Sequence, residues 1–227
     1  MRAPLAAAAT AFLLCVGGCK PPKYVQHASI HSDFECAVPW GWTVITDGEG
    51  GHFTNTTFIG PFEPDFYLGA PSLSVRWHAY SYPHRLPDGG LEMYNDAEDY
   101  IQQTLREVYG NRVMSQPPRD IIVHGKKARH FVVLSPAPVP PDRRWGVVED
   151  AETGKPVNLR EHAYVVVALK RGFYVLIYPA TRAGFKKYEP HFNQLVNTFK
   201  ILKEGPDGAA VEWQGPAPAR QAGKRLG

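Results

Sequence analysis

The stretch that decides the fold is HAYVVVALKRGFYVLIYPA, His162 to Ala180. Two apolar runs rich in β-branched and aromatic residues flank a polar turn at Lys170, Arg171 and Gly172, a pattern that predicts a β-hairpin. A second segment, DIIVHGKKARHFVVL, predicts another hairpin that turns at Gly125. Because hairpins join antiparallel strands, we expect an antiparallel sheet.

The segment that follows, AGFKKYEPHFNQLVNTFKIL, has its apolar residues at helical spacing. Pro190 would disrupt the interior of a helix, so the regular part is predicted to begin near Glu189, with Pro190 in its first turn. The residues expected on the buried face are Phe185, Tyr188, Phe192, Leu195, Val196 and Phe199.

The first half of the chain predicts strands and then one helix. Segments 34–46, 52–60 and 72–80 are β-rich, and in the third Leu73, Val75 and Trp77 alternate with polar residues. A helix is predicted with Asn95 as N-cap, Glu98 as its capping partner and Gly110 as its end. Strands, helix, hairpins and helix together indicate an α+β fold in which two main amphipathic helices bury their apolar faces against a central antiparallel sheet.

The N-terminus has the layout of an export signal. A basic start, Met1–Arg2, precedes the 16 apolar and small residues of 3–18, fewer than the roughly 20 that span a bilayer as a helix. Val16–Gly17–Gly18–Cys19 resembles the lipobox of bacterial lipoproteins. The resemblance implies that residues 1–18 are a signal peptide and that the Cys19 thiol carries diacylglycerol. An ordinary signal that contains cysteines by chance is the alternative.

Cysteine usage fits this interpretation. With Cys15 removed and Cys19 acylated, only Cys36 remains, so no intramolecular disulfide can form. Cys36 is expected to be a small buried apolar residue. The rest of the chain divides into a polar tether over 19–32, a folded domain over 33–203, and a tail over 204–227 whose Pro, Gly and Ala content predicts disorder.

Two segments carry a resemblance to the PsbP-like family of extrinsic photosystem II subunits. They are VPWGWTV (38–44) and GFYVLIYPATRAGFKKYEPHFNQLVNTFKIL (172–202), which ends in an aromatic residue next to a basic one, Phe199–Lys200. The resemblance extends over 34–202 and implies an α/β/α sandwich. Photosynthetic members help to retain metal and chloride at a manganese cluster, and relatives bind a nuclear GTPase, so it implies binding tasks without a common reaction. The long insertion 135–161 departs from the family pattern.

Catalytic motifs are missing from the sequence. It contains no G-x-S-x-G and no phosphate-binding Gly-rich loop, and Cys36 falls in an expected strand. The net charge of +3 without a long basic run argues against nucleic-acid binding. We therefore expect neither enzymatic activity nor a cofactor. His78 and His84 at a strand end, and His124 and His130 beside a hairpin turn, are the suggestions of a metal site, with Glu92, Asp88 or Asp65 as a third ligand. No ligand spacing supports a site, and none is predicted; His78 and His84 are the weak guess.

Aromatic and arginine residues gather in proline-containing loops, and such residues are common in protein interfaces. The alternative is that they cap the open ends of the sandwich. The candidate partner surface consists of Phe62, Phe66, Tyr67, Tyr80, Tyr82, Arg143, Arg144 and Trp145.

The sequence therefore favours a non-enzymatic, lipid-anchored domain of the bacterial cell envelope, which binds or stabilises an envelope protein partner at the membrane. A lipoprotein that binds a small ligand or metal in the cleft beside the sheet is the alternative. Lys20, where an aspartate would signal the inner membrane in some bacteria, favours the outer membrane with the domain facing the periplasm.

Overall fold

The computed structural model describes residues 23–63, 69–85, 90–108, 114–139, 147–150 and 154–206. The signal peptide, Cys19, Lys20 and the tail from residue 207 onward lie outside the described residues. In the described part of the chain, neither helix has the length and apolar character that crossing a bilayer requires.

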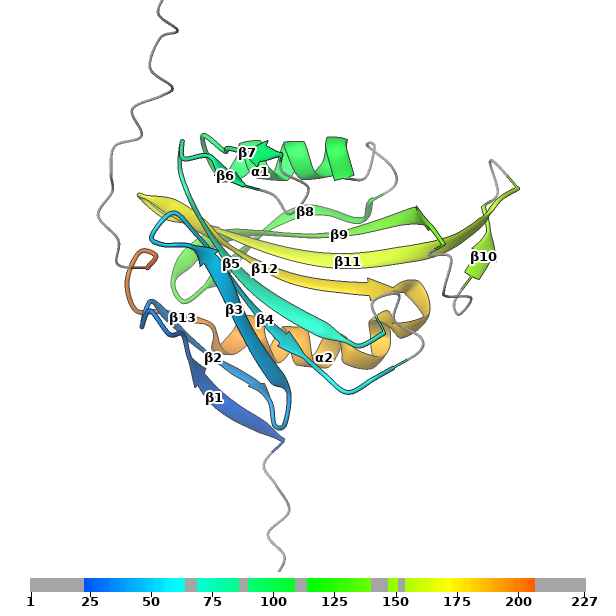
Figure 1. Cartoon of the computed structure of the whole chain (residues 1–227), viewed down its shortest axis with the longest axis horizontal. Helices are drawn as coiled ribbons and strands as arrows, with labels where there is room; N and C mark the ends of the chain where they lie inside the picture. The colour runs from blue at the N-terminus through cyan, green and yellow to red at the C-terminus, as the bar shows by residue number, and fades with distance from the viewer. Residues whose placement is uncertain are drawn as a thin grey trace, which may run out of the picture.

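The largest element is an antiparallel sheet of eight strands (Figure 1). Its order is β3-β4-β5-β12-β11-β9-β8, and β10 pairs with β11. The two predicted hairpins are adjacent in this sheet: β11–β12 lies in its centre and β8–β9 at one edge. This confirms the expected antiparallel sheet. The strands are β3 (Thr43–Glu49), β4 (Phe53–Ile59), β5 (Ser72–Ala79), β8 (Met114–Val123), β9 (Lys126–Pro138), β10 (Val147–Glu149), β11 (Pro156–Ala168) and β12 (Gly172–Thr181).

Two smaller sheets complete the strands. One has the order β1-β2-β13, formed by β1 (Tyr24–Ala28), β2 (Phe34–Pro39) and β13 (Lys200–Ile201). The other pairs β6 (His84–Arg85) with β7 (Leu91–Glu92). Strand β1 corrects the expected tether, because residues 24–28 pair with β2 along their whole length and Val25 packs against the core. Sequence reasoning misses this strand because its polar composition hides an edge strand.

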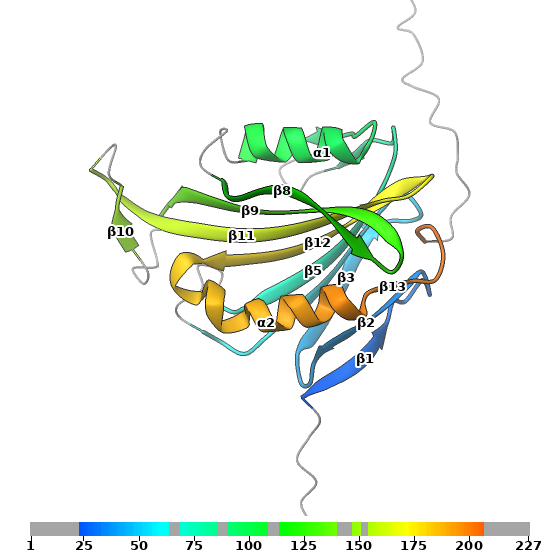
Figure 2. The same cartoon turned by 180° about the vertical axis from the view of Figure 1, so that it is seen from behind.

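One helix covers each face of the large sheet (Figures 1 and 2). Helix α1 (Ala97–Gln103) continues into a π-helical turn, η1 (Thr104–Val108), and α2 (Arg182–Thr198) lies on the other side. Strand β12 serves both faces: Phe173, Val175 and Ile177 pack toward α1, and the alternate residues Tyr174 and Leu176 pack toward α2. The α/β/α arrangement with two main helices is therefore confirmed.

The start of α2 differs from the sequence prediction. The helix begins at Arg182, and the hydroxyl of Thr181 caps it by accepting the backbone N–H of Gly184 at 3.2 Å. Pro190 lies inside the helix and is exposed. The predicted start near Glu189 is wrong because Phe185 and Tyr188, which lie in the earlier turns, are buried against the sheet.

The cap of α1 is shifted by one residue from the prediction. Asp96 is the N-cap and accepts the backbone N–H of Asp99 at 2.7 Å. The Asp99 carboxylate accepts the N–H of Asn95 at 3.1 Å in return. The arrangement resembles a capping box, except that Asp99 bonds the N–H of the residue before the cap, and it uses Asp96 and Asp99 instead of Asn95 and Glu98.

Candidate functional site

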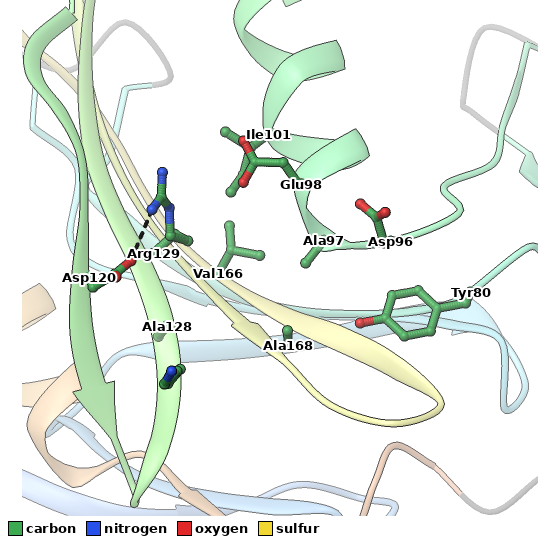
Figure 3. A pocket seen from close by; sticks show the side chains of 11 residues that line it. Tyr80, Asp96, Ala97, Glu98, Ile101, Asp120, Ala128, Arg129, Val166 and Ala168 are labelled. Atoms are coloured by element: carbon green, nitrogen blue, oxygen red, sulfur yellow. Dashed lines mark hydrogen bonds and ion pairs between the residues drawn. The ribbon is translucent and has the colours of Figure 1, made fainter.

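A pocket of about 330 Å³ opens between α1 and the large sheet (Figure 3). Its apolar floor is made by Ala97 and Ile101 of α1 and Val166 of β11. Charged side chains and one tyrosine surround that floor. The complete lining is Tyr80, Asp96, Ala97, Glu98, Ile101, Asp120, Lys127, Ala128, Arg129, Val166 and Ala168.

The basic side of the pocket comes from the β8–β9 hairpin. Lys127 and Arg129 are two residues apart on β9, so they project from the same face of the strand, the face that carries Phe131 and Val133 into the core beneath α1. Arg129 makes an ion pair of 2.9 Å with Asp120 of β8, and both side chains are substantially exposed. Such a pair contributes only about 0–1 kcal/mol, so a ligand can compete for the guanidinium.

The acidic side comes from the first turn of α1. Asp96 and Glu98 line the pocket, and their hydrogen bonds come from neutral donors. Asp96 accepts the backbone N–H of Asp99, and Glu98 accepts the side-chain amide of Gln102 at 2.9 Å. No cation among the described residues is paired with either carboxylate, so this side of the pocket keeps its negative charge.

Tyr80 lies at the rim, just after β5. Burial raises the pKa of its hydroxyl, and the negative charge of Asp96 raises it further. The hydroxyl therefore stays protonated at neutral pH and can donate a hydrogen bond. Of the three described members of the predicted partner surface, Tyr80 alone lines this pocket.

The two candidate metal ligands lie next to each other beneath the β6–β7 hairpin. The ring centroids of His78 and His84 are 4.9 Å apart, and Nε2 of His84 lies 3.2 Å from Oε2 of Glu92, which also accepts the Tyr94 hydroxyl at 2.6 Å. Within the described residues, however, no group of three His, Cys, Asp or Glu side chains could hold a metal ion. Glu92 thus serves His84 and Tyr94 as a hydrogen-bond acceptor.

His78 itself is enclosed by aromatic rings. Its side chain is buried, and neither ring nitrogen has a hydrogen-bond partner among the described residues. Burial lowers the pKa of His78 well below its ordinary value, and the charges of His84 and Arg76 lower it further. At neutral pH the ring is therefore an uncharged packing element. The surrounding rings belong to Phe53, Tyr94, Tyr100 and Phe173.

The structure does not bring the described members of the predicted partner surface together. Phe62 follows β4 and is 72% exposed, beside Glu63, which is bonded to Lys187 of α2 at 2.8 Å. Tyr80 and Tyr82 follow the opposite end of β5, about 26 Å away at ~3.3 Å per residue, and Tyr82 stacks on His52 with ring centroids 3.5 Å apart. Phe66, Tyr67, Arg143, Arg144 and Trp145 lie outside the described residues.

Sequence reasoning misses most of the pocket. The helix dipole alone accounts for Asp96 and Glu98 in the sequence, and nothing there singles out Asp120, Lys127 or Arg129. One local signal is present: in KKARHFVV the positions 127, 129, 131 and 133 share one strand face that changes from charged to apolar. The change marks the point on the strand where a covering helix stops. Only the tertiary structure shows which helix covers the apolar part of the strand.

Comparison with known proteins finds similarity at the level of fold. No family model and no curated protein sequence matches the chain. The solved structures that resemble it include cyanobacterial PsbP from Synechocystis sp. PCC 6803, with 13% identity, coverage of 83% of this chain and 98% of that one, and a TM-score of 0.46. PsbP-like proteins are thus among the structures that this chain resembles, as the sequence indicated.

Two further structures show the same level of similarity. LpqN of Mycobacterium tuberculosis, described as involved in cell envelope biogenesis, is 13% identical over 78% of this chain and 90% of LpqN, with a TM-score of 0.44. A protein from Bacteroides thetaiotaomicron is 12% identical over 81% of this chain, with a TM-score of 0.44, and this chain spans half of its length.

Proposed function

We propose that this chain is a non-catalytic binding domain of the cell envelope, anchored through lipid on Cys19, and that the pocket between α1 and the sheet is its binding site. The pocket is the observation that carries the proposal. At about 330 Å³ it falls in the range of small-molecule sites, and it combines an apolar floor with a few polar groups, as such sites do. This is the small-ligand alternative that the sequence left open.

The chemistry of the lining favours binding over covalent catalysis. The eleven described residues that line the pocket include no Ser, Thr, Cys or His, so the usual nucleophile and base pairs are not available within that lining. Cys36 is buried in the core on the α2 side of the sheet, and burial raises the pKa of its thiol to about 12. That thiol stays protonated at neutral pH.

A substitution that fills the pocket tests whether a ligand binds there. Ala168 lines the pocket and is exposed, so Ala168→Trp adds a large side chain there without overpacking the core. Ala183→Trp, at an exposed position of α2, is the matched control. Small compounds with apolar bodies are screened by thermal shift and ligand-observed NMR. We expect ligands that stabilise the wild type and Ala183→Trp but not Ala168→Trp. Equal binding to all three proteins would place the ligand elsewhere.

The anchor is supported by Val16–Gly17–Gly18–Cys19 and by the single cysteine that remains after it. Cys19→Ser should release the protein from the membrane fraction and block processing of the signal, whereas Cys15→Ser should change neither. Membrane retention of Cys19→Ser with normal processing would refute lipidation. Placement in the outer membrane, facing the periplasm, remains part of the proposal and rests on Lys20.

A protein partner is the second candidate. Phe62 (72% exposed) and Trp40 (55% exposed) present large aromatic surface to solvent, and such side chains often dominate the energy of protein interfaces. Mild cross-linking of the native lipidated protein in its own membranes, followed by mass spectrometry, would identify a stoichiometric partner. Phe62→Ala and Trp40→Ala should weaken that association and leave the folded state intact. Association unchanged in both variants would exclude these residues from the interface.

A further inference from the structure

The pocket has opposite charges on its two sides. Asp96 and Glu98 lie at the start of α1, and Arg129 comes from β9 (Figure 3). Lys127, which also lines the pocket, is on β9 as well. Between them lies the apolar floor formed by residues such as Ile101 and Val166. A ligand that fills this pocket therefore meets negative charge, apolar surface and positive charge together.

Each side of the pocket keeps at least one charge that no described residue neutralises. Asp120 neutralises Arg129, but Lys127 has no ion-pair partner among the described residues, and the buried Nε of Arg129 has no hydrogen-bond partner there. On the other side, Asp96 and Glu98 accept hydrogen bonds only from neutral groups. A ligand with a single charge would satisfy one side and desolvate the other without compensation, which costs free energy.

We propose that the ligand is a zwitterion with an apolar body, of the size of an apolar amino acid or a dipeptide with free ends. Its ammonium group lies against Glu98 and Asp96, its anionic group lies against Lys127 and Arg129, and its side chains cover the apolar floor. This assignment rests on the proposed function, because it names the ligand class of the same pocket.

The size of the pocket agrees with this class. A volume of about 330 Å³ corresponds to about eleven waters at ~30 Å³ each, which suits a molecule between an amino acid and a dipeptide. The protonated Tyr80 hydroxyl at the rim adds a neutral donor. A lipid headgroup that carries ammonium and phosphate shares this chemistry, so the experiment includes it as a separate source.

Four peptides that share the same apolar side chains and differ only in their terminal charges test whether both charges are needed for binding. They are Leu-Leu with free ends, N-acetyl-Leu-Leu, Leu-Leu amide and N-acetyl-Leu-Leu amide, which are a zwitterion, an anion, a cation and a neutral molecule. Titration calorimetry with the intact folded domain should show that the free-ended peptide binds at least tenfold more tightly than either singly blocked peptide. The doubly blocked peptide should bind most weakly. Monomeric dihexanoyl phosphatidylethanolamine tests the headgroup source.

Charge reversals test the two sides of the pocket separately. Lys127→Glu should weaken the free-ended peptide at least tenfold and leave Leu-Leu amide unaffected or tighter, while Lys126→Glu, on the neighbouring residue that does not line the pocket, should change neither. Glu98→Lys should weaken both peptides that have a free ammonium group. Asp47→Lys, at an exposed position of β3, is its control.

The outcomes separate the ligand class from the existence of the site. Equal binding of all four peptides, or tightest binding of a singly charged one, with Ala168→Trp abolishing it, would overturn the zwitterion class and leave the pocket as a binding site. Failure of every zwitterion, the lipid included, would also overturn the class, and the wider screen above would still decide whether the pocket binds anything. Binding of the lipid alone, sensitive to Lys127→Glu, would support the class and assign it to a headgroup.

Discussion

At the scale of single residues, the space around Gly172 constrains how β12 pairs with β5. A Cβ at this position would lie 2.2 Å from the backbone oxygen of His78 and 2.7 Å from the ring of Trp77. Trp77 is itself fixed, because it is buried and its indole N–H donates to the carbonyl of Gly51 at 3.1 Å. The glycine therefore allows the two strands to approach each other closely.

We predict that Gly172→Ala lowers the free energy of unfolding by about 3 kcal/mol, the upper part of the range for overpacking. Gly125→Ala is the control: that glycine has a positive φ of 72°, and a Cβ added there would have no other atom within 4 Å, so the change should cost about 1 kcal/mol. Urea denaturation measures both. Equal losses would show that the β5–β12 contact adapts to the extra methyl group.

His78 predicts a specific dependence of stability on pH. Because its pKa is lowered in the folded state, the unfolded chain binds the proton more readily below the ordinary value of about 6.5. Above pH 6.5 His78 is neutral in both states, so it adds no pH dependence. Below pH 6.5 the free energy of unfolding falls as the pH falls, by up to about 1.4 kcal/mol per pH unit for one histidine. His162, whose pKa is lowered to about 3 chiefly by burial, adds a slope of the same sign.

His78→Phe should flatten this slope between pH 6.5 and 5 and should raise the free energy of unfolding at pH 7. The gain is expected because the variant removes two buried ring nitrogens that have no partner among the described residues, and an unsatisfied buried polar group costs about 1–3 kcal/mol. Denaturation at several pH values measures both effects, with His31→Phe as a control outside the core. A less stable variant at pH 7 would mean that the imidazole makes a hydrogen bond in the folded protein.

At the scale of elements, α2 shows where local rules fail. A proline inside a helix costs about 3 kcal/mol, which is why the sequence predicts a start near Glu189. Burial of Phe185 and Tyr188 contributes roughly 1.5–3 kcal/mol for each side chain, so the packing of the earlier turns outweighs the proline. The apolar spacing did predict the buried face: Phe192 and Leu195 lie on it, as expected.

We therefore predict that Pro190→Ala stabilises the protein by about 2–2.6 kcal/mol. The full helix penalty of about 3 kcal/mol is reduced, because proline also restricts the unfolded chain by about 0.4–1 kcal/mol; the ring is exposed, so its removal costs little packing. Thermal and urea denaturation measure the gain, with Glu189→Ala as the control in the same turn. A loss of stability would indicate that a bend at Pro190 is needed for α2 to follow the sheet.

At the scale of the whole molecule, the pocket follows from a mismatch of lengths. Helix α1 and its π-helical continuation η1 have seven and five residues, about 18 Å together, whereas β9 and β11 beneath them have 13 residues each, about 43 Å. One short helix leaves part of that face uncovered. The sequence predicted the sheet, the hairpins and both helices. The pocket, however, needs four segments that are separate in sequence (residue 80 and residues 96–101, 120–129 and 166–168), and no local pattern specifies which face each helix covers.

The two faces of the sheet should respond independently to mutation. Ile101 belongs to the cluster beneath α1, and Leu195 belongs to the cluster beneath α2. Ile101→Val should cost about 0.5–1.5 kcal/mol and Leu195→Ala about 2–5 kcal/mol, and in the double variant the losses should add to within about 0.5 kcal/mol. Chemical denaturation of the four proteins measures the coupling. A larger coupling energy would show that the sheet transmits strain between its faces.

Because β1 begins at Tyr24, the linker between Cys19 and the folded domain is short. Cys19 and Tyr24 are five residues apart, a span of at most about 18 Å when fully extended. A lipid on Cys19 would hold the first strand close to the bilayer, so the domain could turn over the membrane only within a narrow range. Helix α1 lies on the opposite side of the molecule from β1 (Figures 1 and 2). The pocket, which lies beneath α1, would then be on the side of the domain away from the bilayer and near solutes of the surrounding compartment.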